Sequence, residues 1–154
     1  MDYFTKKNLL FDLKQELEMD VYYQIKDCGD RPAIVNPVYQ HSDKTGRNYR
    51  TGFVNRVTVE DIDEDGNLLY DIWCFYKEDG QSRHETLYHK PAVKQDKVMF
   101  WLKQFYSAAA IIYRTLLPHT AQEILDSEVY EQRYGILKYT AEKEAAEEAK
   151  WKAI

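Results

Sequence analysis

Carboxylates stand at alternate positions from Asp61 to Asp65, and Gly66 follows them directly. This spacing matches the first half of an EF-hand calcium loop, in which alternate side chains supply oxygen ligands and the glycine permits a sharp turn. The twelfth position of such a loop carries a bidentate glutamate, but here it is Ile72. The sequence therefore favours a solvated hairpin turn without a metal, and a weak divalent-ion site at the hairpin tip remains the open alternative.

Aromatic and basic side chains gather in the segment after this turn. A two-residue turn at Asp65 and Gly66 would set Val59 opposite Ile72, which gives the hairpin one apolar face and one mixed face. Rings flanked by cations on the mixed face would suit recognition of a protein or of a nucleic acid. The predicted members of this binding surface are Arg56 (opposite Phe75), Trp73, Phe75, Lys77, His84, Tyr88 and Lys90.

Cover by a helix is the competing arrangement for this face, because a domain with several helices more often buries a second apolar sheet face than displays it. A further surface lies at the hairpin itself, where five carboxylates give the sheet a negative end. Such a cluster can occupy the basic groove of a nucleic-acid-processing protein in the way a phosphate backbone would. This acidic hairpin consists of Glu60, Asp61, Asp63, Glu64 and Asp65.

Signatures of catalysis are missing from the sequence, which contains no GxSxG, HExxH, Walker or GxGxxG motif. His84 and His89 are an odd number of positions apart, so on one strand they would point to opposite faces and could not share a metal. A dyad of Cys74 with His84 is the remaining route to an enzyme. We therefore expect no cofactor and no enzymatic activity, with a dispersed active site as an alternative.

Charge and composition limit the classes of partner and the cellular compartment that we expect. The chain has 154 residues and a net charge of −5, which opposes indiscriminate binding to nucleic acid or to anionic membranes. The segment 98–117 is apolar, but Lys103 and Arg114 would be costly in hydrocarbon, so we expect a buried helix and no membrane partner. Only Cys28 and Cys74 are present and the N-terminus lacks a signal-peptide pattern, which favours reduced thiols in a cytoplasmic protein.

Periodicity predicts how these residues are positioned. Leucines at helical spacing predict a helix over 5–18, and four turn signals then separate five predicted strands at 21–26, 33–40, 49–61, 68–77 and 83–89. A helix over 98–117 ends before Pro118, and Thr120 to Glu123 has the form of a capping box that starts another helix. The prediction is a single α+β domain of residues 1–154: an N-terminal helix, a five-stranded antiparallel meander that can curl strongly, and two to three C-terminal helices packed on it. Residues 140–154 are predicted to form a helical extension that becomes ordered on a partner.

These observations predict a non-enzymatic binding module that acts through protein–protein contacts, such as a small acidic adaptor or inhibitor of a nucleic-acid-processing partner. A nucleic-acid-binding protein that uses the aromatic and basic face is the first alternative. An enzyme with a dispersed active site is the second. The identity of the partner and the oligomeric state are not predicted.

Overall fold

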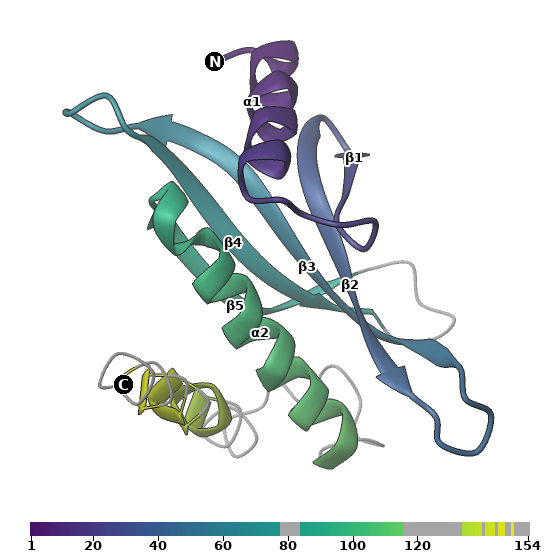
Figure 1. Cartoon of the computed structure of the whole chain (residues 1–154). Coiled ribbons are helices and arrows are strands. Elements are labelled where there is room, and N and C mark those ends of the chain that lie inside the picture. Colours follow the sequence, from purple (N-terminus) through teal and green to yellow (C-terminus); the bar gives the residue numbers. More distant parts are fainter. Residues whose placement is uncertain (78–83, 116–133, 140, 144, 147–148, 150–154) are drawn as a thin grey trace.

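A computed structural model describes residues 1–77, 84–115, 134–139, 141–143, 145–146 and 149 (Figure 1). Along the chain the elements are α1 (Tyr3–Glu16), β1 (Gln24–Cys28), β2 (Arg31–His41), β3 (Asn48–Ile62), β4 (Leu68–Tyr76), β5 (Glu85–Val93) and α2 (Gln95–Thr115). Residues 134–139 are also helical. The predicted order of helix, strands and helices is confirmed.

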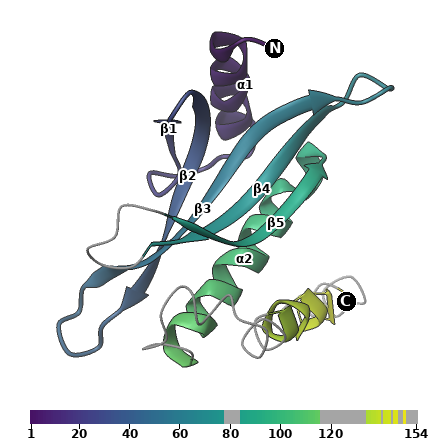
Figure 2. The ribbon, with the colours of Figure 1, turned by 180° about the vertical axis from the view of Figure 1, so that it is seen from behind.

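The five strands form one antiparallel sheet in the order β1-β2-β3-β4-β5. This is the predicted meander, and the sheet stays open, with β1 and β5 at its edges. Both α1 and α2 lie on the same face of the sheet, as the two opposite views show (Figures 1 and 2). The fold is therefore α+β with all described helical cover on one side.

The core lies between this helical layer and the sheet. Leu10 and Leu13 of α1 and Leu102 and Phe105 of α2 are at most 2% exposed. They meet the inward side chains of the strands, whose burial alternates along β4 as expected for a sheet with one covered face. The inward members from β3 and β4 are Phe53, Val57, Val59, Tyr70, Ile72, Cys74 and Tyr76.

The register of β3 and β4 differs from the prediction. Val59 pairs with Tyr70, whereas the two-residue turn had placed it opposite Ile72. The connection is longer than a two-residue turn, because the last pair is Ile62 with Leu68, and a register shift between Val59 and Asp61 adds a second displacement. The combined displacement is two residues, so every side chain of β3 and β4 keeps the face that the sequence predicted.

The two edge strands, β1 and β5, have bounds that differ from the predicted ones. β1 starts at Gln24 and not at residue 21, because the Asp20 side chain accepts a hydrogen bond from the Tyr22 N–H at 2.9 Å and the chain turns there. β5 continues through Pro91 to Val93, although the prediction ended it at residue 89. An edge strand tolerates proline because one side of its backbone has no strand to donate to.

After α2, the structure describes residues 134–139 and a few positions between 141 and 149. Ile136 and Leu137, in the helical segment 134–139, pack against the core. The predicted capping box at 120–123 lies outside the described residues, as does most of the predicted extension at 140–154. Within the described part of the chain, no helix combines the length and hydrophobicity that crossing a membrane requires.

Gly52 provides a test of how tightly β3 and β4 are packed. Its φ is +91°, and a Cβ at this position would lie 2.7 Å from the backbone oxygen of Lys77. Gly46 also has a positive φ, +68°, but a Cβ there would meet nothing within 4 Å. We expect Gly46→Ala to lower the free energy of unfolding by about 1 kcal/mol, and Gly52→Ala by about 1 to 3 kcal/mol more.

Urea denaturation of the two variants beside the wild type measures this difference. Equal losses in both variants would show that backbone strain alone matters at Gly52 and that the close approach of Lys77 does not.

Candidate functional site

The sheet face turned away from α1 and α2 carries a continuous set of stacked and hydrogen-bonded side chains, which we call the ring face. No helix of the described part of the chain lies over it (Figure 2). Its members come from β3, β4, β5 and the residue directly before β5. They are Arg56, Thr58, Glu60, Asp71, Trp73, Phe75, His84 and His89.

Trp73 stands at the centre of the ring face. The His89 ring stacks on it from the neighbouring strand, with ring centroids 3.6 Å apart and planes within 5° of parallel. Phe75 lies two positions along the same strand, with its ring centroid 5.7 Å away and nearly parallel. Each such aromatic pair contributes about 0.5 to 1.5 kcal/mol beyond the area that it buries.

Hydrogen bonds fix the orientation of the stacked His89 ring. Its Nε2 lies 2.7 Å from Asp71 Oδ2, and because an ionised carboxylate can only accept, Nε2 carries the proton. The other Asp71 oxygen accepts from the backbone N–H of Ala92 at 3.2 Å, which holds the carboxylate in place. The imidazole is therefore held at its edge by Asp71 and on its face by Trp73.

The indole nitrogen of Trp73 is also satisfied. It donates to Thr58 Oγ1 at 3.2 Å, and the Thr58 hydroxyl donates in turn to Glu60 Oε1 at 2.7 Å. Arg31 of the neighbouring strand β2 lies 3.7 Å from the same Glu60 oxygen. This chain of contacts links side chains of β2, β3 and β4 and holds the Trp73 indole in one orientation.

Cations border the rings at the other end of the face. The Arg56 guanidinium lies over the Phe75 ring, 4.7 Å from its centroid, and the His84 ring meets the edge of Phe75 at 6.3 Å. Burial, followed by the positive charges of Arg56 and Lys77, lowers the pKa of His84 below its ordinary value of 6.5. His84 therefore stays neutral to lower pH than an exposed histidine does.

The structure brings together five of the seven residues predicted to form the binding surface. Trp73, Phe75 and Arg56 contact one another in the ring face, with His84 and Lys77 beside them. Arg56 pairs with Trp73 and not with Phe75, because of the two-residue displacement described above, yet its guanidinium still reaches Phe75.

Tyr88 and Lys90 are not on the ring face. Tyr88 is 1% exposed, pairs with Cys74 and stacks on Phe105 of α2, and the Lys90 ammonium lies over the Trp101 ring of α2. Their placement beside Trp73 was wrong because the β4–β5 register shifts between Cys74 and Phe75.

The same shift corrects the expectation for the histidines. His84 and His89 both contact rings of the ring face, although odd spacing on a regular strand had predicted opposite faces. The proposed dyad of Cys74 with His84 is not assembled, because Cys74 is buried on the helix-covered side of the sheet. Among the described residues, no group of three His, Cys, Asp or Glu side chains is arranged to hold a metal.

The acidic hairpin forms the end of β3 and β4, and its tip projects past the helical layer (Figure 1). Asp63 organises the turn: its Oδ1 accepts from the backbone N–H groups of Asp65 and Asn67 at 2.9 and 2.8 Å. These bonds, chiefly that from Asn67, hold the pKa of Asp63 below its usual 3.8. Strands flank the turn on both sides, as the hairpin prediction required, and the other carboxylates of the tip, Asp61, Glu64 and Asp65, are exposed.

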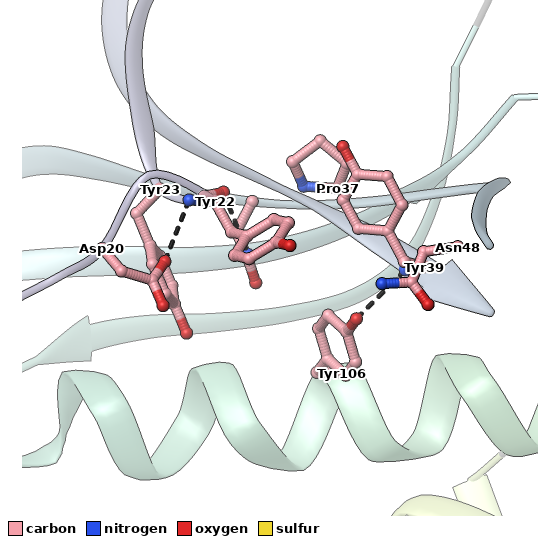
Figure 3. Close-up of a pocket in the computed structure, with 8 residues that line it drawn as sticks. Asp20, Tyr22, Tyr23, Pro37, Tyr39, Asn48 and Tyr106 are labelled. Atoms are coloured by element: carbon pink, nitrogen blue, oxygen red, sulfur yellow. Dashed lines mark hydrogen bonds between the residues drawn. The ribbon is translucent and has the colours of Figure 1, made fainter. Parts of the chain in front are cut away.

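A cleft, which we call the tyrosine cleft, opens between β2 and α2 on the helix-covered side of the sheet. Its volume is about 280 Å³, and it is lined by Asp20, Tyr22, Tyr23, Asn36, Pro37, Tyr39, Asn48 and Tyr106. Figure 3 shows Asp20 and Tyr23 at one end, Tyr39 and Asn48 at the other, and Tyr106 rising from α2. The Tyr106 hydroxyl accepts from the Tyr39 N–H at 3.0 Å, which ties the helix to the strand.

The predicted binding surface did not include Asp71 and His89, and the tyrosine cleft was not predicted at all. The alternation of β4 already placed Asp71 beside Trp73, so a search for an acidic partner two positions away could have found it. The excess of 13 tyrosines was the only signal for the cleft. It could not say which of them meet, because the cleft draws on four separate segments of the chain.

Comparisons of this chain with known protein families, with curated proteins and with solved structures give no match. The function is therefore inferred from the ring face and the acidic hairpin alone.

Acidification is expected to weaken the fold through His84. A lowered histidine pKa means that the unfolded chain binds the proton more tightly, so the stabilisation is complete above the unfolded value of 6.5 and is lost as the pH falls through the folded value. We expect His84→Gln to flatten the decrease in the free energy of unfolding below pH 6.5, as measured by urea denaturation across a pH series. His41→Gln, at an exposed position, is the control. An unchanged slope in His84→Gln would contradict the inferred environment.

Calcium is not expected to stabilise the acidic hairpin. Both Asp63 oxygens accept hydrogen bonds within the turn, including one from the Asn67 side chain at 3.2 Å, so a metal would have to displace the bonds that form the turn. The melting temperature with and without millimolar calcium measures this, and a clear upward shift with calcium would reveal a divalent-ion site.

Proposed function

We propose that this protein is a non-enzymatic binding module that contacts a basic protein partner through the ring face and the acidic hairpin. The observation that carries the proposal is the arrangement of Arg56, Phe75, Trp73 and His89 in one stacked set on a sheet face without helical cover among the described residues. Aromatic residues and arginine are the residue types that contribute most binding energy at the centres of protein interfaces.

The rigidity of this set supports the same function. Binding costs less when side chains are already held in their bound orientation, because less conformational freedom is lost. Trp73 and His89 are each held by a hydrogen bond and by mutual stacking. The Trp73 indole N–H and the His89 Nε2–H are thus paired within the face, so a partner can cover these two donors without leaving them unpaired.

Two features favour a protein over a nucleic acid as the partner. Stacking of a base needs an open ring face, but His89 covers a face of Trp73 and Arg56 lies over the ring of Phe75. The carboxylates of Asp71 and Glu60 also belong to this surface, where they would repel a phosphate backbone.

The acidic hairpin supports a basic partner. Its exposed carboxylates lie at the projecting end of the two strands that also carry Trp73 and Arg56, so one partner can contact both surfaces. Complementary charge raises the rate of association and selects among partners. Basic grooves are typical of nucleic-acid-processing proteins, and we infer that the chain acts as an adaptor for, or an inhibitor of, a protein of this kind.

Paired variants test this proposal. The wild type, Trp73→Ala and the double variant Glu64→Lys with Asp65→Lys are immobilised, and the proteins that each retains from the native cell are compared by quantitative mass spectrometry. Asp12→Lys with Asp43→Lys is the charge-matched control, at exposed positions in α1 and in the β2–β3 connection. We expect a partner that the wild type and the control retain and that the other two variants lose.

Calorimetry with the purified partner then supplies the magnitude. Loss of a central aromatic contact should weaken binding by about 30-fold, provided that the variant's melting curve shows it to be folded. Retention of the same proteins by all four baits would refute the proposal. Binding of oligonucleotides that weakens steeply with salt, without a retained protein, would favour the nucleic-acid alternative.

A further inference from the structure

The tyrosine cleft has a composition that selects for positive charge. Four of its lining residues are tyrosines and one is an aspartate, while none of the described residues that line it is a lysine, arginine or histidine. The faces of aromatic rings carry partial negative charge and attract cations, most strongly where water is partly excluded. The wall of the cleft is therefore complementary to a positively charged ligand.

Asn36 forms a buried part of the cleft wall. Its side chain is 3% exposed, and its Nδ2 donates to the backbone oxygen of Tyr22 at 3.2 Å. A carbonyl oxygen can only accept, so this bond fixes the orientation of the amide and leaves Oδ1 on the other side. Asn36 Oδ1 has no hydrogen-bond partner among the residues that the structure describes. This oxygen is closed off from solvent, so a molecule in the cleft does not reach it, and recognition depends on the tyrosines and Asp20.

Asp20 supplies the negative charge at the mouth of the cleft. One of its oxygens accepts from the Tyr22 N–H, which orients the carboxylate, and the residue itself is exposed. The environment already disfavours a second negative charge, since burial and then the nearby Asp20 and Tyr106 raise the pKa of Tyr23 above its ordinary value of 10.0. Among the described residues that line the cleft, Asp20 is thus the one charged side chain, and its charge is negative.

We propose that the tyrosine cleft binds a small organic ammonium ion, with the alkyl groups against the tyrosine rings and the positive charge facing Asp20. The volume of about 280 Å³ is near the lower end for ligand pockets, which is about 300 Å³, and so fits a molecule of the size of choline better than a larger one. This site lies on the opposite side of the sheet from the ring face, and it does not depend on the function proposed above.

Choline and its uncharged isostere 3,3-dimethylbutan-1-ol form the test pair, because they share shape and hydroxyl group but differ in charge. Isothermal titration calorimetry on the full chain is expected to show binding of choline and at least about tenfold weaker binding of the isostere. Phosphocholine tests a lipid headgroup as the source of the ammonium group. We expect it to bind more weakly than choline, since its phosphate would approach Asp20.

Two variants at exposed positions locate the site without risk to the core. Asp20→Asn keeps an oxygen that can accept from the Tyr22 N–H but loses the charge, and Tyr22→Ala removes a ring that is 50% exposed. Each should weaken choline binding by about tenfold. Asp12→Asn and Tyr139→Ala, whose ring is 64% exposed, are the matched controls and should bind as the wild type does.

Four results would overturn the proposal. The first is equal binding of choline and its isostere, because the cleft would then recognise shape and not charge. The second is choline binding that neither Asp20→Asn nor Tyr22→Ala weakens, because the site would then lie elsewhere. The third is the absence of binding for both choline and tetramethylammonium at tens of millimolar. Phosphocholine that binds as tightly as choline or more tightly would instead assign the site to a lipid headgroup and overturn a free ammonium ion as the ligand.

Discussion

The alternation of side chains across the β3–β4 pair determines which residues form the core and which form the ring face. Val57 pairs with Ile72 toward the helices, and the next pair, Arg56 with Trp73, points the other way. A slip of one residue would place an indole and a guanidinium in the core and two aliphatic side chains in solvent, so the core strongly selects the parity of the register. The longer turn and the shift beside Asp61 displace the pairing by an even number, which the core permits.

Because the described helices cover one face of the sheet, the side chains of the other face are held only by contacts with one another. The ring face does so with contacts within the sheet: Thr58 receives the indole N–H of Trp73, Asp71 receives the imidazole N–H of His89, and the rings stack across the strands. Cross-strand pairs of this kind each contribute a few tenths to about 1 kcal/mol, which is sufficient for local order but well below the contribution of a covered core. The ring face is therefore rigid and at the same time available for contact.

Local sequence patterns predicted most of the fold because each turn signal and each change of period acts within a few residues. The alternation in β4 placed Trp73 and Phe75 on the face turned away from the core without knowledge of any partner strand. The same reasoning failed for Tyr88 and Lys90, since the shift between Cys74 and Phe75 depends on the packing of β5 and α2 and leaves no local signal. The tyrosine cleft was beyond prediction for a related reason: its walls come from segments that are distant in sequence and meet only in the folded chain.

A polar strip in the core connects the tyrosine cleft with the centre of the sheet. Asn36 and Asn55 are cross-strand partners on the helix-covered face, and they are 3% and 0% exposed. Neither amide oxygen has a partner among the described residues, and each buried unsatisfied acceptor costs about 1 to 3 kcal/mol relative to an apolar residue of similar shape. Asn55 offsets part of this cost by donating to the Leu102 carbonyl of α2 at 3.4 Å. Asn36 also lines the cleft, so the strip runs from the cleft wall to the contact of Asn55 with α2.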